Sequence, residues 1–219
     1  IHVKESLRLT GLEEKNIENY DMQDSKKFST QLRKISKPTL IVANKIDVNG
    51  ADRNFERLRE RYNDTIVVPA SADSELTLRR AEQKNLIRYS PGSEQFDILN
   101  TDDLNQKQKD ALDFISKDIM GEYMRTGVQF AINMTVFKLL KMNSIYPVAD
   151  PENLSDKKGR VLPDLVLLKD GATVVDLAKE VHSDLVKGLL YAKDLRYNLR
   201  IPINYQLRDR DVIFLISAS

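Results

Sequence analysis

Residues 39–47 read Thr-Leu-Ile-Val-Ala-Asn-Lys-Ile-Asp, an apolar, β-branched run that ends in polar side chains. A second stretch, Val-Val-Pro-Ala-Ser-Ala-Asp-Ser-Glu at 67–75, makes the same change from apolar to polar. Short apolar runs of this kind are typical of strands buried in a parallel sheet. The charged segment 52–62 lies between them and predicts a helix, which would turn Phe55, Leu58 and Tyr62 inward. We therefore expect a strand–helix–strand unit with both polar stretches at the carboxyl edge of its sheet.

The polar residues of the two stretches are of the types that recognise guanine. A carboxylate such as Asp47 can accept hydrogen bonds from N1–H and N2–H₂ of guanine, whereas N1 of adenine offers a repelled lone pair. Such sites discriminate by about 10⁴-fold in favourable cases. The stretches resemble the base-recognition motifs of guanine-specific GTPases. This resemblance implies a guanine-binding set of Asn44, Lys45, Asp47, Ser71 and Ala72, with Lys45 lying along the base and ribose and the Ala72 N–H bonding O6.

An ordinary turn is the alternative interpretation of the first motif, because Asn, Asp and the nearby Gly50 all favour turns. The second motif favours base recognition, since Ser71 begins it 24 residues after Asp47, beyond the predicted helix and strand.

Composition limits the classes of function. The 219 residues suffice for one or two domains with a real core. Lys and Arg number 34 against 33 Asp and Glu, so the whole chain has no electrostatic signature of a polyanion-binding protein. The absence of Cys excludes thiolate catalysis and sulfur-ligated metals, and two His argue against a His-based metal centre. Neither a signal peptide nor a membrane-spanning run is visible, so we expect a cytoplasmic protein.

The chain divides into segments of different character. Residues 1–37 read as helical and polar, 38–75 carry the two motifs, and 76–144 are again helical, with helices expected at 76–87, 105–120 and 128–142. The last segment, 145–219, mixes strand signals with one helix. Its strands are expected at 161–168, 189–192, 205–207 and 212–216, and its helix opens with the capping pattern Thr173-x-x-Asp176. One helix against a small mixed sheet suggests an α+β, β-grasp (ubiquitin-like) module.

The last segment also carries a family pattern. Gly171-x-Thr173, Asp176-Leu177-Ala178, Val181-His182-x-Asp184-Leu185, Tyr191-Ala192 and Tyr205-x-Leu207-x-Asp209-x-Asp211-Val212-Ile213 follow in the order found in TGS domains. With the motifs ahead of it, the chain resembles the C-terminal part of an archaeal Obg-family GTPase of the YchF-like type over essentially all its residues. The implied fold is part of a P-loop GTPase α/β domain with helical insertions, at 1–144, followed by a β-grasp TGS domain at 145–219.

The resemblance carries expectations about ligand and activity. Bacterial and eukaryotic YchF proteins are known for a degraded base motif and a preference for ATP, whereas Asn44, Lys45 and Asp47 are intact here, which implies GTP or GDP with Mg²⁺ in the intact protein. The related DRG family also pairs this motif with TGS and stays an alternative. The 219 residues contain no Gly-rich phosphate loop. We therefore expect a fragment of a GTP hydrolase that is inactive by itself, and we assign it no catalytic residue and no metal ligand.

The partner of the last segment is open between two interpretations. Basic residues outnumber acidic ones between 186 and 210, with tyrosines interleaved, which suits an RNA-contact surface made of Lys187, Lys193, Arg196, Arg200 and Arg208. A plain solvated surface explains the same residues. The resemblance implies ribosome or translation-factor association. Two hypotheses follow: a GTP-binding regulator that acts on the ribosome, or a non-catalytic TGS-bearing module that binds RNA or protein.

Overall fold

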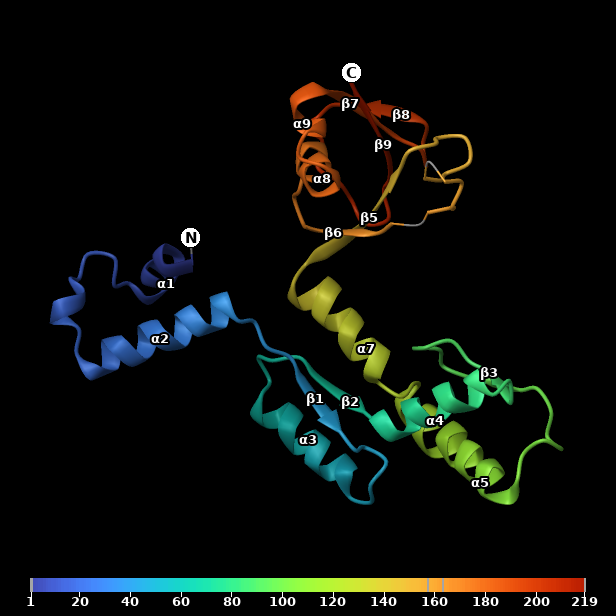
Figure 1. Ribbon diagram of the computed structural model, residues 1–219. Coiled ribbons are helices and arrows are strands. Elements are labelled where there is room, and N and C mark those ends of the chain that lie inside the picture. Colours follow the sequence, from blue (N-terminus) through green and yellow to red (C-terminus); the bar gives the residue numbers. More distant parts are fainter. Residues whose placement is uncertain (1, 157, 163, 219) are drawn as a thin grey trace. The chain divides into compact units, whose positions relative to one another are not determined.

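The computed structural model describes residues 2–156, 158–162 and 164–218. The chain forms two compact units, Ile1–Thr135 and Val136–Ser219. The division falls within a π-helical segment, η3 (Met134–Leu139), that continues helix α7 (Val128–Asn133). Each unit has its own hydrophobic core, and we describe each by itself (Figure 1).

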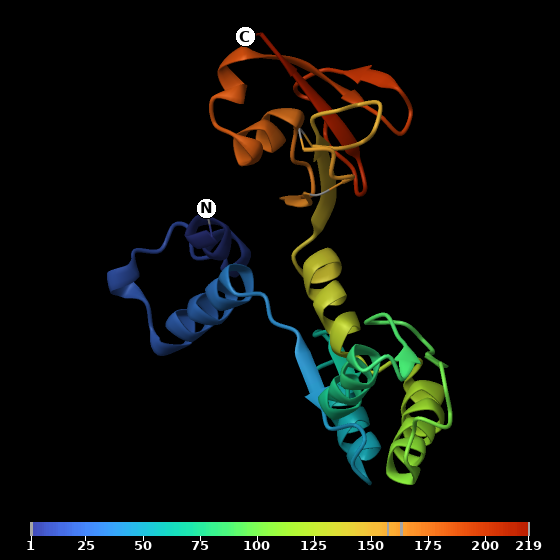
Figure 2. The same cartoon turned by 45° about the vertical axis from the view of Figure 1, so that its right-hand side comes forward.

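The first unit opens with two helices, as the sequence predicts. Helix α1 (His2–Thr10) ends at Gly11, which has a positive φ of 70°, and α2 (Met22–Ser36) begins at a capping box between Asp21 and Asp24. A short 3₁₀ turn, η1 (Ile17–Asn19), lies between them. The helices run side by side in Figures 1 and 2. Lys27 Nζ of α2 donates to the carbonyl of Thr10, the last residue of α1, over 2.8 Å.

The two motifs follow a pair of parallel strands. Strand β1 (Ile41–Asn44) pairs with β2 (Val67–Ala70), and helices α3 (Ala51–Arg61) and α4 (Ala72–Gln83) follow them. Asn44 is opposite Ala70 in this register, so both motifs leave the sheet at its carboxyl edge. Ile46 and Phe55 form a buried cluster with Ile119. The expectation that Tyr62 points inward is wrong: α3 ends at Arg61 and the Tyr62 side chain is exposed.

A hairpin and a second set of helices complete the first unit. They are β3 (Ile87–Arg88), β4 (Asp97–Ile98), α5 (Gln106–Phe114), the π-helical η2 (Ile115–Met120) and α6 (Gly121–Tyr123). The prediction of a helix over 76–87 is wrong at its end, because α4 stops at Gln83 and Asn85 takes a left-handed φ of 56°. The hairpin strands have two residues each, too short for periodicity to reveal.

The second unit is a five-stranded sheet with a helix on one face. Its strand order is β6-β5-β9-β7-β8, and the β5–β9 pair is parallel. Figure 2 shows α8 and α9 together on one side of the strands. The elements are β5 (Met142–Val148), β6 (Val166–Lys169), α8 (Val174–Val181), α9 (Leu185–Gly188), β7 (Leu189–Asp194), β8 (Leu199–Ile201) and β9 (Val212–Ser217). Leu177 of α8 is fully buried against Ile145 and Ile213 of the central strands. This arrangement confirms the predicted β-grasp class.

Three strand boundaries differ from prediction. The predicted helix 128–142 gives way to β5, because Lys141 turns the backbone with a φ of 51°. The strand predicted over 161–168 begins only at Val166, because Val161 is largely exposed and makes one isolated bridge to Ser155; position 163 lies outside the described residues. The segment 205–207 makes one bridge, from Gln206 to Thr173, and is not a strand.

Candidate functional site

The two motifs meet where β1 and β2 end. Asn44 is the last residue of β1, and its side-chain Oδ1 accepts a hydrogen bond from the backbone N–H of Ala72, 3.1 Å away. The N–H of Ile46 donates to the carbonyl of Ala70 over 3.1 Å. The structure thus brings together the loops that carry all five residues predicted to recognise guanine, and two hydrogen bonds join these loops directly.

Lys45 has an unusual backbone conformation. Its φ is 67°, in the left-handed region, where the Cβ of an L-residue meets the carbonyl that follows. The turn closes through the N–H of Val48, which donates to the Lys45 carbonyl over 3.1 Å. Ile46 is buried in the core, whereas Asn44 and Lys45 are exposed. The left-handed turn therefore places Ile46 in the core and leaves Asn44 and Lys45 at the surface. Non-glycine residues held in such a conformation cluster at functional sites.

Helix α4 begins at the second motif. Ser71 is fully buried and caps the helix, its Oγ accepting from the N–H of Ser74 over 3.1 Å. Ala72 is the first helical residue, so its N–H is one of the donors that a helix N-terminus leaves without an intrahelical partner. Such donors favour an electronegative ligand atom. The first motif thus carries an acceptor carboxylate, Asp47, and the second carries a helix N-terminal N–H, the two kinds of group that the donor and acceptor edge of guanine would require.

Glu75, in the first turn of α4, has a buried carboxylate, and the sequence analysis assigns it no role. Oε2 accepts hydrogen bonds from Thr126 Oγ1 at 2.5 Å and from the Tyr89 hydroxyl at 2.8 Å. Oε1 accepts from Arg79 Nε at 2.6 Å. Burial by itself would raise the pKa of Glu75, but these three hydrogen bonds outweigh it and hold that pKa below its usual value. Glu75 is therefore an ionised carboxylate inside the first unit.

Gly127 is also missed by the sequence. Its φ is 86°, and a Cβ there would lie 2.0 Å from the carbonyl oxygen of Pro69 and 2.8 Å from Cα of Ala70. The backbone of Gly127 thus packs against the end of β2, immediately before the second motif. Only glycine combines this φ with this close approach.

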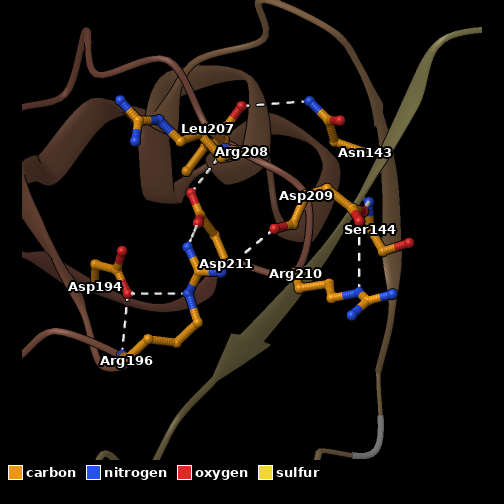
Figure 3. Close-up of polar contacts among 9 residues, drawn as sticks. All are labelled: Asn143, Ser144, Asp194, Arg196, Leu207, Arg208, Asp209, Arg210 and Asp211. Carbon is orange, nitrogen blue, oxygen red and sulfur yellow. Dashed lines mark hydrogen bonds and ion pairs between the residues drawn. The ribbon is translucent and has the colours of Figure 1, made fainter.

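In the second unit, the Arg196 side chain forms ion pairs with acidic residues of its own unit. Its guanidinium forms an ion pair with the fully buried Asp211 and lies 3.6 Å from Asp194, as Figure 3 shows. Its backbone N–H also donates to Asp194. The carboxylate of Asp211 accepts a further hydrogen bond from the Arg208 N–H at 2.8 Å. The charge of Arg196 is thus balanced internally.

The other predicted RNA-contact residues lie on separate elements. Lys193 and Arg200 are opposite each other on β7 and β8, and the Arg200 guanidinium stacks 3.8 Å from the ring centroid of Tyr191. Lys187 lies on α9 and pairs with Asp184 at 3.2 Å. Arg208 is exposed in the loop before β9. The structure therefore brings Lys193, Arg200 and Tyr191 together, and places Lys187 and Arg208 outside the sheet.

Two classes of feature are absent from the part of the chain that the structure describes. Residues 2–156, 158–162 and 164–218 contain no group of three or more His, Asp or Glu side chains arranged to hold a metal ion. Within the same ranges, no helix is long and apolar enough to cross a bilayer.

Comparison with known proteins agrees with both units. Residues 42–150 match the family described as Obg-like GTPase YGR210-like, G4 motif-containing domain, and residues 153–217 match the TGS domain. An uncharacterized GTP-binding protein of Methanocaldococcus jannaschii, MJ1332, is 42% identical over 197 residues, which cover 90% of this chain and 49% of the relative. An uncharacterized GTP-binding protein of Schizosaccharomyces pombe, C428.15, is 27% identical over 172 residues, which cover 75% of this chain and 42% of the relative.

A solved structure, a GTP binding protein from Pyrococcus horikoshii OT3, superposes with a TM-score of 0.75 at 35% identity. The match covers 99% of this chain and 56% of that one. The chain thus spans about half the length of the relatives it matches.

The parallel strands with their joined loops, followed by a β-grasp unit, define the G4-motif part of a GTPase fold linked to a TGS domain. The chain carries the G4 motif-containing domain of the YGR210-like, Obg-like GTPases followed by a TGS domain. This confirms the predicted fold class and the resemblance to the Obg family.

Proposed function

We propose that this chain is the guanine-selecting part of a GTP-binding protein. The observation that carries the proposal is the hydrogen bond from the Ala72 N–H to Asn44 Oδ1, because it holds the two motifs together at one edge of the sheet. Asp47 would accept hydrogen bonds from N1–H and N2–H₂ of the base, and Lys45 would lay its methylene stem along the ring. Ala72 would donate to O6 while Ser71 fixes the start of α4.

Phosphate and metal binding belong to the proposal for the full-length protein. The relatives are named GTP-binding proteins and are about twice as long as the matched region. Mg²⁺ would accompany the phosphates of GTP or GDP there, with hydrolysis as the reaction. The described residues show no metal-binding cluster, so we assign no residue of this chain to the ion.

The test is a comparison of nucleotides that share one diphosphate. GDP, ADP and inosine diphosphate are titrated into the full-length gene product by calorimetry. We expect GDP to bind about 10⁴-fold more tightly than ADP, because ADP leaves the Asp47 carboxylate unpaired. Inosine diphosphate lacks the N2 amine, and its affinity should be lower than that of GDP by at least about tenfold. GDP and ADP affinities within tenfold of each other would refute guanine selection.

For the TGS unit we propose contact with RNA in a cytoplasmic, ribosome-associated role. Arg200 stacked on Tyr191 and facing Lys193 offers positive charge beside an aromatic ring, which suits a single-stranded backbone with unstacked bases. Lys187 and Arg208 would add charge at the periphery. Arg196 is left out, because its guanidinium is engaged by Asp194 and Asp211.

Salt-dependent binding to single-stranded RNA tests this proposal. Lys193→Gln with Arg200→Gln should weaken binding and reduce the steepness with which affinity falls as salt rises. Arg57→Gln, an exposed residue of α3 in the first unit, is the matched control. If the double variant binds RNA as tightly as the control and with the same salt dependence, Lys193 and Arg200 do not contact RNA and this proposal is wrong. RNA binding without guanine selection would favour the alternative of a non-catalytic TGS module.

A further inference from the structure

In the first unit, Thr126 forms hydrogen bonds with two residues of the second motif that lie far from it in the sequence. Thr126 is fully buried and lies 51 residues after Glu75. Its carbonyl accepts a hydrogen bond from the Ser71 N–H over 2.8 Å, and its hydroxyl donates to the Glu75 carboxylate over 2.5 Å. Thr126 therefore contacts the first turn of α4 at both its cap residue and its fourth helical residue.

The Glu75 carboxylate is well suited to hold that turn. Its side chain is 5% exposed and receives donors from Thr126, Tyr89 and Arg79, so its oxygens are fixed from three directions. Hydrogen bonds to a charged, buried acceptor are stronger than neutral ones. Between Ser71 and Glu75 lies Ala72, whose N–H points at Asn44 in the first motif.

We propose that Thr126, through Glu75, is a positioning residue for the Ala72 N–H and so sets how well the second motif recognises O6 of guanine. This inference rests on the proposed guanine selection and deepens it. Gly127 supports it, because its backbone packs against Pro69 and Ala70 and places Thr126 beside the end of β2. Thr126 acts on the helix start and does not itself touch the base.

The test separates positioning from general stability by changing one atom of the ligand. GDP and 6-thio-GDP differ only at position 6, where sulfur is a weaker acceptor than oxygen. The ratio of their affinities therefore reports the hydrogen bond to O6. Thr126→Val keeps the shape and removes the hydroxyl, whereas Thr126→Ser keeps the hydroxyl and removes the methyl group. Both are measured in the full-length gene product.

We expect Thr126→Val to lower the GDP affinity about fivefold and to shrink the preference for GDP over 6-thio-GDP, because one hydrogen bond is lost from the support. Thr126→Ser should keep the wild-type preference. Tyr89→Phe, which removes a second donor to Glu75, should also shrink it, and it serves if Thr126→Val does not fold.

An unchanged preference in whichever of these two hydroxyl-deleted variants folds would overturn the proposal, as would an equal loss for both nucleotides. Failure of guanine selection is seen separately, as equal binding of GDP and ADP by the wild-type protein.

Discussion

The side-chain oxygen of Asn44 accepts a hydrogen bond from the backbone N–H of Ala72, 28 residues later in the chain. This bond joins the end of β1 to the start of α4 across parallel strands whose register places Asn44 beside Ala70. The same N–H is the donor that the proposed function gives to O6 of guanine. Base binding would therefore require Ala72 to share or exchange this bond, which makes the two loops respond together.

A substitution at Lys45, which has a left-handed backbone, should affect the stability of the fold and the affinity for GDP differently. Lys45→Gly removes the Cβ that this φ disfavours, which should offset the greater freedom of glycine in the unfolded chain. We expect the free energy of unfolding to stay equal or rise by up to about 1 kcal/mol. GDP affinity should fall, because the side chain that is proposed to lie along the base is lost. Urea unfolding and calorimetry measure the two effects. Arg210→Gly, also at a left-handed position, is the control and should leave GDP affinity unchanged; unchanged affinity in Lys45→Gly would contradict the role of Lys45.

Gly127 should tolerate no side chain. In Gly127→Ala the new Cβ would overlap the Pro69 carbonyl as well as strain the backbone. We expect a loss of about 2–5 kcal/mol in the stability of the first unit, from strain and overpacking together. Gly50→Ala has a similar φ of 79° but no atom within 4 Å of the added Cβ, so it should lose only about 1–2 kcal/mol. Chemical denaturation of both variants checks the difference, and equal losses would mean that the close approach is unimportant.

Arg196 should matter for the fold of the second unit. Arg196→Met leaves Asp211 buried without its cation, and we expect a loss of about 3–5 kcal/mol in the free energy of unfolding. Arg200→Met, at an exposed position, should lose no more than about 1 kcal/mol. Adding Asp211→Asn to Arg196→Met should recover part of the loss. A destabilisation by Arg196→Met no larger than that of Arg200→Met would show that the buried pair is not structural.

The cap of α8 predicts a pH dependence. The backbone N–H of Thr173, helped by Lys179 and the Thr173 hydroxyl, lowers the pKa of Asp176 to about 2. Because the pKa is lower in the folded state, the carboxylate stabilises the fold above about pH 4 and loses this effect as pH falls towards 2. Asp176→Ala should therefore lose about 1 kcal/mol at pH 7 and much less at pH 2.5. Urea unfolding at both pH values measures this. Glu180→Ala, exposed on the same helix, is the control, and a loss in Asp176→Ala that does not depend on pH would refute the cap.

Local sequence patterns predict where the two motifs lie at the edge of the sheet, but they do not predict the buried contacts that hold the second motif in place. The motifs at Asn44 and Ser71 follow apolar runs within a few residues, so their positions could be inferred from sequence. Thr126 could not be found in this way, because it meets Glu75 across 51 residues and a Thr-Gly pair has no distinctive local pattern.

In the second unit, β5 has no clear signal in the sequence, since a proline such as Pro147 is uncommon in a central strand. The strand tolerates it in a parallel pair opposite Ile213 of β9. Composition also grouped Arg196 with the other cations, since the pairing of a charge with a buried Asp211 depends on the tertiary structure.

The most direct test of guanine selection is to change the base that the protein prefers. Asp47→Asn replaces a double acceptor with an amide, which can donate to O2 of xanthine where guanine carries its N2 amine. In the full-length gene product we expect this variant to bind GDP at least about 100-fold more weakly and xanthosine diphosphate more tightly than the wild type does. Asp118→Asn, an exposed carboxylate of η2, should change neither affinity. If Asp47→Asn keeps the wild-type affinities for both nucleotides, Asp47 does not recognise the base and the proposed function is wrong.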